Sequence, residues 1–320
     1  PEDQISVEAG GLVNTKSESV DVDHPIRWKL PCFMIGLFLW SCVSGCFNAS
    51  FYYPNDKTYK TPADYGLTYD TVSFMSRDHT RLNGWFIPAT GKPMGTVIYF
   101  YGDFANRTYY LKHIHWLPPK GFNVFTFDYR GYGDSDGKPD RAGIYLDSVA
   151  AIQYVLTRSD IDRNNLFVYG QSLGGVFAIA AVAQNRFPGI RAVAVEGTFA
   201  SFRAEARYMM LHKSRQTIGQ ASCLTWPIEP LTLVGVSDAY SPIDLVDRVS
   251  PVPLLIIHCK SDTAVPHKQA EALFQQAEAP KYLWSVQGCE HVKLFIDWAL
   301  SPKYRDRLAN FFKAYRSKSP

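Results

Sequence analysis

The stretch Leu166-Phe167-Val168-Tyr169-Gly170-Gln171-Ser172-Leu173-Gly174-Gly175 decides the fold. A short apolar run before a G-x-S-x-G pattern predicts a buried parallel strand, and the alanine-rich apolar run after it predicts a helix. Ser172 is therefore expected at a tight strand-to-helix turn, where Gly170 and Gly174 leave room for closely passing backbone. The hydroxyl then projects from the sheet, and the N–H of Leu173 at the helix N-terminus can stabilise an oxyanion. The alternative is a glycine-rich turn that Ser172 merely caps.

Apolar runs alternate with helical patterns along most of the chain. This alternation predicts an α/β fold, with a mostly parallel, doubly wound sheet and flanking helices. The first two strands are expected to form an antiparallel hairpin, and the insertion over 199–250 is too short for a large lid and is expected to shape the substrate pocket. The predicted strands cover 71–75, 82–87, 96–100, 122–127, 166–169, 192–198, 253–258 and 282–286, with helices near 106–116, 141–156 and 173–183.

Composition limits the classes of protein. With 46% hydrophobic and 20% charged residues, a chain of 320 residues can bury one large core in a single domain with tails. The net charge is +3 without a long run of lysine or arginine, which argues against a nucleic-acid partner.

The N-terminal part differs from the rest. Residues 1–29 are polar and are expected to be a disordered tail or a misassigned start. Residues 30–47 form an apolar run with basic residues before it and small residues near its end, which is the layout of a secretory signal. Its last residues, Val43-Ser44-Gly45-Cys46, resemble the bacterial lipobox, which implies cleavage before Cys46 and a lipid on its sulfur.

The same apolar run fits other interpretations. Its 18 residues are marginally long enough for an uncleaved transmembrane anchor, and a buried core helix is the third possibility. An exported bacterial lipoprotein and a protein with a single N-terminal anchor would both hold the catalytic part at a membrane face. Residues 48–64 are then a tether, and residues 65–320 form the catalytic domain.

Two later residues can complete a nucleophilic site. A serine nucleophile needs a base, and the base needs a carboxylate to orient it. In a parallel sheet both are expected at the carboxyl ends of strands, and Asp262 and His291 follow the last two predicted strands. The order Ser172, Asp262, His291 is the one expected for this fold. The alternatives are a helix cap for Asp262, a loop histidine for His291, and Glu196 as the acid.

These motifs resemble the α/β-hydrolase superfamily over roughly residues 65–316. The nearest branch looks like the compact serine hydrolases with little cap, which include monoacylglycerol lipases, lysophospholipases and protein depalmitoylases. The motifs that carry the resemblance are DYRGYGDS at 128–135, GQSLGG at 170–175, IIHCKSD at 256–262 and GCEH at 288–291.

The chain departs from the family after the third strand. The family has His-Gly where this chain has Tyr101-Gly102. Because the working group there is a backbone amide, the resemblance still implies an oxyanion hole, made by the amides of Asp103 and Leu173.

The second departure is a pair of cysteines. Cys259 and Cys289 stand where the family has small residues, next to the loops of the predicted acid and base. These loops must be neighbours if the acid and base hydrogen-bond, and exported proteins tend to pair spare thiols. A Cys259–Cys289 disulfide with Cys223 left free is one expectation, and two unpaired small residues are the other.

Together, the predicted triad and the resemblance imply a serine hydrolase that cleaves carboxylic ester or thioester bonds through an acyl-enzyme. The expected substrates are lipid-like or short acyl compounds at a membrane face. A serine peptidase of the same fold, which a larger cap and an acidic amine-binding pocket would favour, and a non-catalytic binding protein are the alternatives. The triad requires neither a metal ion nor an organic cofactor, and none is implied.

Overall fold

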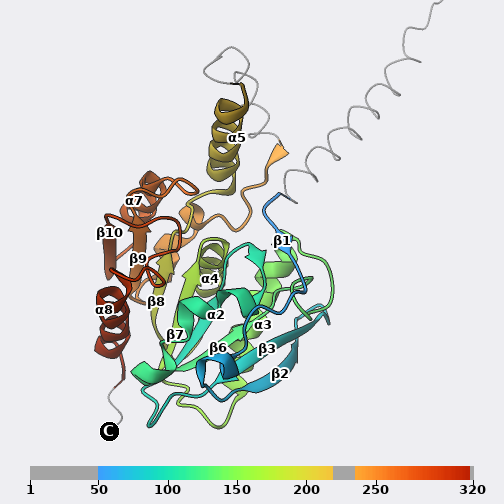
Figure 1. The fold of residues 1–320 in the computed structure, drawn as a ribbon, viewed down its shortest axis with the longest axis vertical. Coiled ribbons are helices and arrows are strands. Elements are labelled where there is room, and N and C mark those ends of the chain that lie inside the picture. The colour runs from blue at the N-terminus through green and yellow to red at the C-terminus, as the bar shows by residue number, and fades with distance from the viewer. Residues whose placement is uncertain (1–49, 219–234, 318–320) are drawn as a thin grey trace, which may run out of the picture. The chain divides into compact units, whose positions relative to one another are not determined.

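The computed structural model describes residues 50–218 and 235–317 of the chain. Its centre is an eight-stranded sheet in the order β10-β9-β8-β7-β4-β6-β3-β2 (Figure 1). β3 runs antiparallel to both of its neighbours, and the other described pairings in this sheet are parallel. The predicted α/β-hydrolase sheet is confirmed. The strands are β2 Asp70–Met75, β3 Arg81–Ile87, β4 Thr96–Phe100, β6 Asn123–Phe127, β7 Leu166–Gln171, β8 Ile190–Glu196, β9 Leu254–Cys259 and β10 Lys281–Val286.

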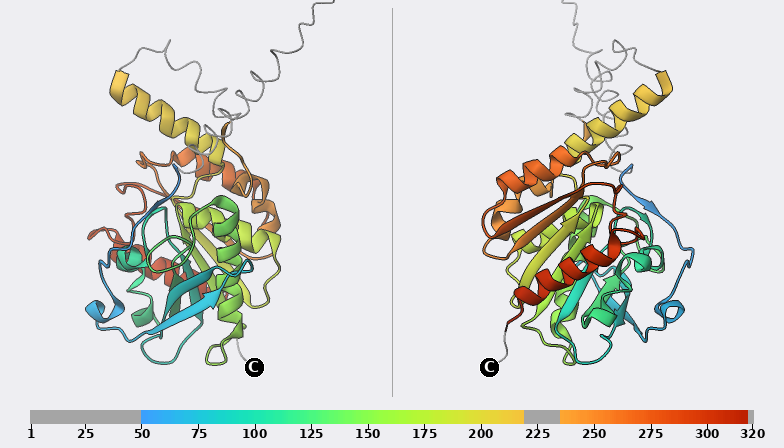
Figure 2. Two further views of the ribbon diagram at one scale, coloured as in Figure 1. Left: turned by 90° about the vertical axis from the view of Figure 1, so that its right-hand side faces the viewer. Right: turned by 60° about the vertical axis from the view of Figure 1, so that its left-hand side comes forward.

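Helices cover both faces of the sheet. α3, α4 and α7 lie on one face, and α2 and α8 lie on the other (Figures 1 and 2). The described helices are α2 Arg107–Ile114, α3 Arg141–Thr157, α4 Leu173–Gln184, α5 Phe202–Ile218, α7 His267–Gln276 and α8 Ser301–Ala314, and the short 3-10 turns are η1 Pro62–Tyr65, η2 Pro118–Lys120, η4 Pro242–Asp244 and η5 Val246–Val249.

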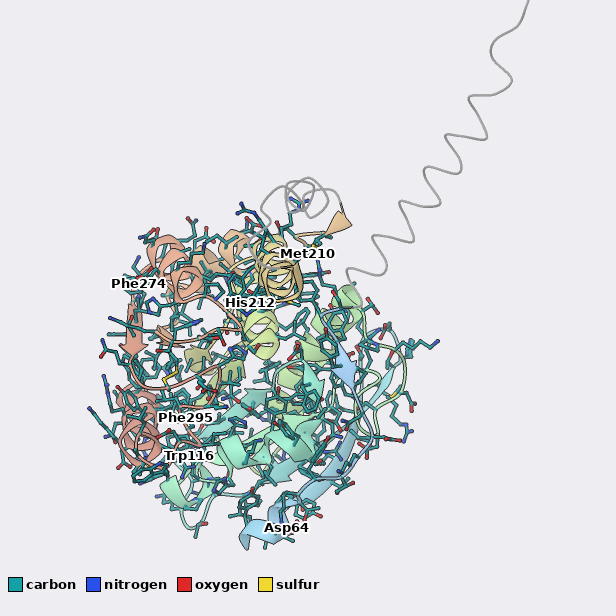
Figure 3. All side chains as sticks on the ribbon, turned by 45° about the horizontal axis from the view of Figure 1, so that its top comes forward. Asp64, Trp116, Met210, His212, Phe274 and Phe295 are labelled. Carbon is teal, nitrogen blue, oxygen red and sulfur yellow. A yellow bond between two sulfur atoms is a disulfide. The ribbon has the colours of Figure 1, made fainter. Side chains whose placement is uncertain are left out.

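The core lies between these layers. Every residue of the central strands β4, β6 and β7 is buried, because both faces of the sheet are covered, and this explains why these strands read as continuous apolar runs. On the α2–α8 face, Phe312 of α8 packs against Phe167 of β7. Trp116 stacks on Phe295 with 5.6 Å between ring centroids, which joins the segment after α2 to the segment before α8 (Figure 3).

The start of the domain lies earlier than the predicted boundary at residue 65. Phe51 and Tyr52 are only 4% and 8% exposed, and the ring of Phe51 meets that of Phe202 at 5.1 Å. The next residues form β1 (Tyr53–Pro54), which pairs in parallel with β5 (Phe104–Ala105). Part of the predicted tether over 48–64 is therefore packed onto the domain. Its partners lie far along the chain, so the local sequence pattern could not reveal them.

Several predictions fall outside the described residues. They concern the tail over 1–29, the apolar run over 30–47 with Cys46, and Cys223. Among the helices that the structure describes, none combines the length and the apolar character needed to cross a bilayer.

Candidate active site

Ser172 occupies a strained turn between β7 and α4. Its φ of 51° and ψ of −121° lie in a region that residues other than glycine rarely adopt. The glycines around it allow close approach: a Cβ on Gly170 would lie 2.6 Å from the Cα of Gly175, and a Cβ on Gly174 would collide with the carbonyl oxygen of Phe100. The turn predicted from the G-x-S-x-G pattern is therefore present, and it raises the serine above the end of the strand.

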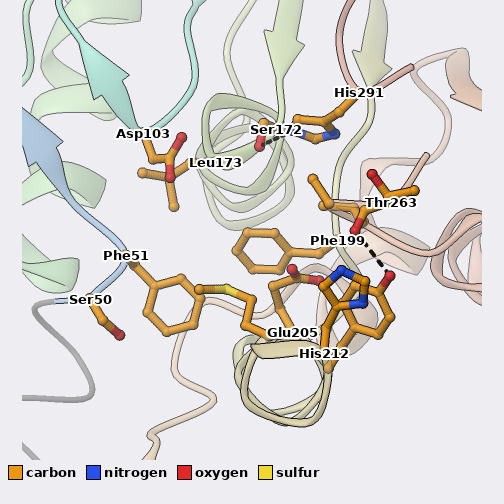
Figure 4. A pocket seen from close by; sticks show the side chains of 14 residues that line it. Ser50, Phe51, Asp103, Ser172, Leu173, Phe199, Glu205, His212, Thr263 and His291 are labelled. Carbon is orange, nitrogen blue, oxygen red and sulfur yellow. Dashed lines mark hydrogen bonds between the residues drawn. The ribbon is translucent and has the colours of Figure 1, made fainter. Parts of the chain in front are cut away.

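The structure brings Ser172, His291 and Asp262 into one hydrogen-bonded chain. Nε2 of His291 lies 3.0 Å from Oγ of Ser172 (Figure 4). Nδ1 of the same imidazole lies 2.7 Å from Oδ2 of Asp262. The other oxygen of Asp262 accepts hydrogen bonds from the N–H groups of Ala264 and Val265, at 2.9 and 2.8 Å. These bonds fix the carboxylate, which in turn orients the imidazole.

The electrostatics of this chain suit a base beside a hydroxyl. Burial alone would raise the pKa of Asp262, but the hydrogen bonds from His258 and His291 outweigh it and hold this pKa well below its usual range. Burial likewise lowers the pKa of His291, while the hydrogen bond and charge of Asp262 dominate and raise it. Asp262 is therefore ionised, and His291 is a stronger base than an isolated imidazole.

His258 supports the same carboxylate from the other side. Its side chain is fully buried on β9, and Nε2 lies 2.9 Å from the carbonyl oxygen of Val265 and 3.4 Å from Oδ2 of Asp262. The loop that presents Asp262 is thus tied back to its own strand.

Glu196, the alternative acid, lies beneath the serine instead of beside the imidazole. Its carboxylate accepts hydrogen bonds from the Tyr169 hydroxyl at 2.6 Å and from Nε2 of Gln171 at 2.5 Å. Its backbone carbonyl accepts the N–H of Ser172 at 2.8 Å. Nδ1 of His291 donates its described hydrogen bond to Asp262 and not to Glu196, so the role of Glu196 is to anchor the turn.

The two residues predicted for the oxyanion hole line the same pocket. Leu173 is the first residue of α4, so its N–H is one of those that a helix leaves without an internal partner. Asp103 lies beside it (Figure 4), and its carbonyl oxygen accepts hydrogen bonds from the Tyr53 N–H and the Tyr132 hydroxyl, both at 2.9 Å. These bonds fix the peptide unit that follows Asp103 at the edge of the pocket.

A pocket of about 280 Å³ opens beside Ser172. As expected from the insertion after β8, helix α5 forms part of its wall, and the Tyr208 hydroxyl on α5 donates to the carbonyl oxygen of Thr263 at 3.0 Å (Figure 4). The lining residues are Ser50, Phe51, Asp103, Ser172, Leu173, Phe199, Glu205, Tyr208, Met209, His212, Thr263, Ala264, Val265 and His291.

Sequence reasoning missed some residues of this site. Glu205 is buried in the pocket, and the signal was its helical spacing from Phe202 and Met209, which places it on the inward face of α5. Gly197 is also constrained, because a Cβ there would lie 3.1 Å from Cε1 of His291. Gly175 belongs with the other glycines of the turn, since a Cβ on it would collide with a neighbouring threonine.

The cysteines next to the acid and base are bonded to each other. Cys259, the last residue of β9, and Cys289 form a disulfide with a Cα–Cα distance of 5.5 Å. Both side chains are buried. The predicted bridge is confirmed, and it joins the loop of Asp262 to the loop of His291.

The described ranges contain no group of three or more histidine, cysteine, aspartate or glutamate side chains arranged to hold a metal ion. The chemistry available at the site is that of a hydroxyl, a base and a carboxylate. A hydroxyl held against a base in this way can attack an acyl carbon.

Comparison with known proteins agrees with the fold. Residues 91–221 match the family described as "Serine aminopeptidase, S33". The chain is 36% identical to YfhR of Escherichia coli O157:H7, over 82% of this chain and 85% of that protein. It is 31% identical to WAV2 of Arabidopsis thaliana, described as an alpha/beta hydrolase domain-containing protein, over 68% of this chain and 70% of that one.

Among solved structures, the Pyrococcus furiosus esterase Pf2001 superposes with a TM-score of 0.65. The match covers 82% of this chain and 100% of the esterase at 21% identity, so it speaks for the fold alone. The fold, the turn that carries Ser172 and the extensive similarity to WAV2 and YfhR lead to one conclusion: the chain belongs to the α/β-hydrolase family.

Proposed function

We propose that the protein is a serine hydrolase that cleaves carboxylic ester or thioester bonds of small acyl substrates. The observation that carries this proposal is the continuous contact from Ser172 through His291 to Asp262 at the mouth of an apolar-walled pocket. A structural serine or a helix cap would not require an oriented imidazole on its hydroxyl. The same contact argues against a purely binding role.

In the proposed mechanism His291 takes the proton of Ser172 as its Oγ attacks the acyl carbon. The amides of Asp103 and Leu173 stabilise the oxyanion, and Asp262 stabilises the imidazolium that forms. His291 then returns the proton to the leaving alcohol or thiol, leaving an acyl-enzyme on Ser172. Water, activated by the same imidazole, releases the acid and restores the serine.

The pocket limits the size of the substrate. A volume of about 280 Å³ lies just below the range of small-molecule sites, which is roughly 300–1,000 Å³. Phe51, Phe199 and Met209 give it apolar walls. A short acyl chain fits this environment better than a bulky polar group.

Ester hydrolysis is tested with p-nitrophenyl esters of increasing acyl length and with a fluorophosphonate probe. We expect turnover of short esters and covalent labelling by the wild-type protein, and loss of both in Ser172→Ala with the fold intact by circular dichroism. Turnover that survives this substitution would rule the proposal out.

A serine peptidase is the second candidate, because the family described for residues 91–221 is an aminopeptidase and the pocket contains the carboxyl groups of Asp103 and Glu205. Aminoacyl amides, assayed beside the matching esters, separate the two activities. Hydrolysis of the esters alone supports the first candidate, and efficient hydrolysis of the amides supports the second.

The proposal includes a location of the protein at a membrane surface. Ser50 and Phe51 line the pocket, and Cys46 precedes Ser50 by so few residues that their Cα atoms are at most about 14 Å apart. A lipid on Cys46, or an anchor ending there, would hold the pocket near the membrane surface, where acyl lipids are available. The buried disulfide agrees with export, since disulfides persist in oxidising compartments.

Intact-mass measurement of the native protein and the variant Cys46→Ser test this location. A lipoprotein would lack residues 1–45, carry lipid on Cys46 and leave the membrane fraction in the variant. An uncleaved anchor would keep residues 1–45 and be unaffected by the substitution. A protein found only in the soluble fraction would contradict both.

A further inference from the structure

The pocket beside Ser172 contains two carboxyl groups, Asp103 and Glu205, and no lysine or arginine among its described lining residues. Glu205 is only 4% exposed. The imidazoles in the pocket are His291, which is engaged by Ser172 and Asp262, and His212, which stacks on Tyr208 with 5.6 Å between ring centroids. The pocket is therefore acidic in character although most of its walls are apolar.

The hydrogen bonds around Glu205 show which of its atoms remain for a ligand. Oε1 of Gln269 accepts the N–H of Ala200 at 2.9 Å, so the amide nitrogen of Gln269 must be the group that faces Glu205. That nitrogen donates to Oε2 of Glu205 at 2.6 Å. One carboxyl oxygen is thus occupied by a neutral partner, and no described hydrogen bond or ion pair gives the other a cation.

A buried carboxyl group without a counterion is unfavourable in its charged form. Burial accordingly raises the pKa of Glu205 to about 8, with the charges of Asp262 and Asp103 acting in the same direction. Burial also raises the pKa of Asp103. A cationic group that entered the pocket would supply the missing counterion, favour the ionised form of a carboxyl group there and pair with it. A phosphate or a second carboxylate would find no lysine or arginine among the described lining residues.

The geometry fits a cation at the end of an alkyl chain. Asp103 and Glu205 come from opposite sides of the pocket, Asp103 next to Leu173 and Glu205 on α5 next to Phe199 (Figure 4). Phe51 and Met209 also line the pocket and give it apolar wall on which methylene groups can pack.

We propose that Glu205 binds a primary ammonium group at the end of the acyl part of the substrate, so that the enzyme prefers short ω-aminoacyl esters. This inference rests on the proposed ester hydrolysis and names the substrate class that the same site selects. The alkyl stem lies on the apolar wall, the ammonium donates to the free oxygen of Glu205, and the acyl carbon reaches Ser172.

The test compares p-nitrophenyl esters of ω-amino acids with methyl-terminated esters of equal chain length, for wild type and Glu205→Gln. Glutamine keeps the size of the side chain and can still accept from Gln269, but it removes the charge. At the best chain length we expect a higher kcat/KM for the amino ester than for its methyl-terminated partner. In Glu205→Gln this ratio should fall by about ten- to a hundredfold.

Glu290→Gln is the matched control. Glu290 is exposed next to His291, outside the pocket lining, and is paired with Lys293 at 2.5 Å. The substitution removes the same charge close to the site. The ratio of kcat/KM for the amino ester to that for the methyl-terminated ester should equal the wild-type ratio. Equal ratios in wild type and Glu205→Gln, or a preference for the methyl-terminated ester at every length, would overturn the inference.

A second variant keeps the test valid if Glu205→Gln folds poorly. Glu205→Asp retains the charge but withdraws it by one methylene, so the preferred ω-amino chain should become one methylene longer. An unchanged optimum would count against Glu205. Hydrolysis of the methyl-terminated esters by wild type, and its loss in Ser172→Ala, reports on the proposed function separately from this selectivity.

Discussion

Ser172 is held from two directions. Its N–H donates to the carbonyl oxygen of Glu196 below the turn, and its hydroxyl meets His291 above it. The first contact sets where the backbone lies, and the second determines what the hydroxyl can do. The backbone of Glu196 and the imidazole of His291 thus act on different parts of the same serine.

The assignment of Asp262 as the acid leads to a direct prediction. Asp262→Asn should lower kcat by a factor on the order of 10⁴, because an amide favours the wrong imidazole tautomer. Steady-state kinetics on a short ester measures this loss. Glu196→Gln is the comparison, since Glu196 bonds Tyr169 and Gln171. If Asp262→Asn kept near-full activity while Glu196→Gln did not, the acid would be Glu196.

The raised pKa of His291 predicts the acid limb of the pH profile. His291 must be neutral to accept the proton of Ser172, so kcat/KM should fall as the pH drops through its pKa. Because burial is outweighed by Asp262, with smaller contributions from Asp103 and Glu196, this limb should lie above the ordinary value of about 6.5.

The variant Asp262→Asn tests the cause of that shift. Without the carboxylate, the pKa of His291 should fall, so the limb moves to lower pH while the plateau drops. A kcat/KM profile measured from pH 5 to 9 would show both changes, and a limb that stayed in place would mean that another group controls it.

At the residue scale, the sequence was most informative where chemistry demands a particular residue type. The positions of Ser172, Asp262 and His291 follow from the order of strands and loops, and the structure brings them together. Glu205 could not be assigned to the pocket, because that depends on how α5 lies above the strand ends. The helical spacing of Glu205 indicates that its side chain is buried. It does not indicate which residues surround the side chain.

At the scale of elements, the disulfide between β9 and the loop after β10 connects the parts that carry acid and base. Its cysteines are 30 residues apart, and closing a loop of that length stabilises a fold by about 3 to 4 kcal/mol in the chain-entropy account. The double variant Cys259→Ser/Cys289→Ser should lose about this much unfolding free energy in urea. Its kcat should also fall by a larger factor than its KM changes, because the loops of Asp262 and His291 are no longer joined to each other.

Wild type treated with a dithiol is the control for side-chain effects of serine. If the reduced protein and the double variant show the same losses, the bridge is responsible. A double variant with unchanged stability and kcat would mean that packing alone holds the two loops.

The success of element prediction has a physical basis. β4, β6 and β7 are buried on both sides, so their apolar runs show where these strands lie. β1 has two residues and is held by pairing with β5. Such a short segment has no periodicity of its own, so the sequence alone does not distinguish it from a tether.

At the scale of the whole molecule, the N-terminal segment connects the proposed anchor to the active site. Tyr53 donates its N–H to the carbonyl oxygen of Asp103, and Phe51 lines the pocket. A chain that begins at Ser50 should therefore hydrolyse soluble esters as the full chain does. A chain that begins at Asp56 should lose activity by up to a factor on the order of 10², the loss typical of a disturbed oxyanion hole.

The two truncations are compared on a soluble ester and on an acyl lipid in vesicles. We expect the chain from Ser50 to lose activity only on the vesicles, because only the full chain is held there. Equal activity of both truncations on the soluble ester would mean that β1 has no influence on the site. Equal activity of the full chain and the Ser50 chain on vesicles would contradict the role of the anchor.

The bond between Cys259 and Cys289 has a topological consequence. It closes a covalent ring that contains Asp262, α7 and β10. A protease that cuts one peptide bond inside this ring opens it without releasing a fragment, so the nicked protein would migrate as one species on a gel until a reductant is added. After a cut between Asp262 and His291, the two residues would lie on different fragments that the disulfide still joins.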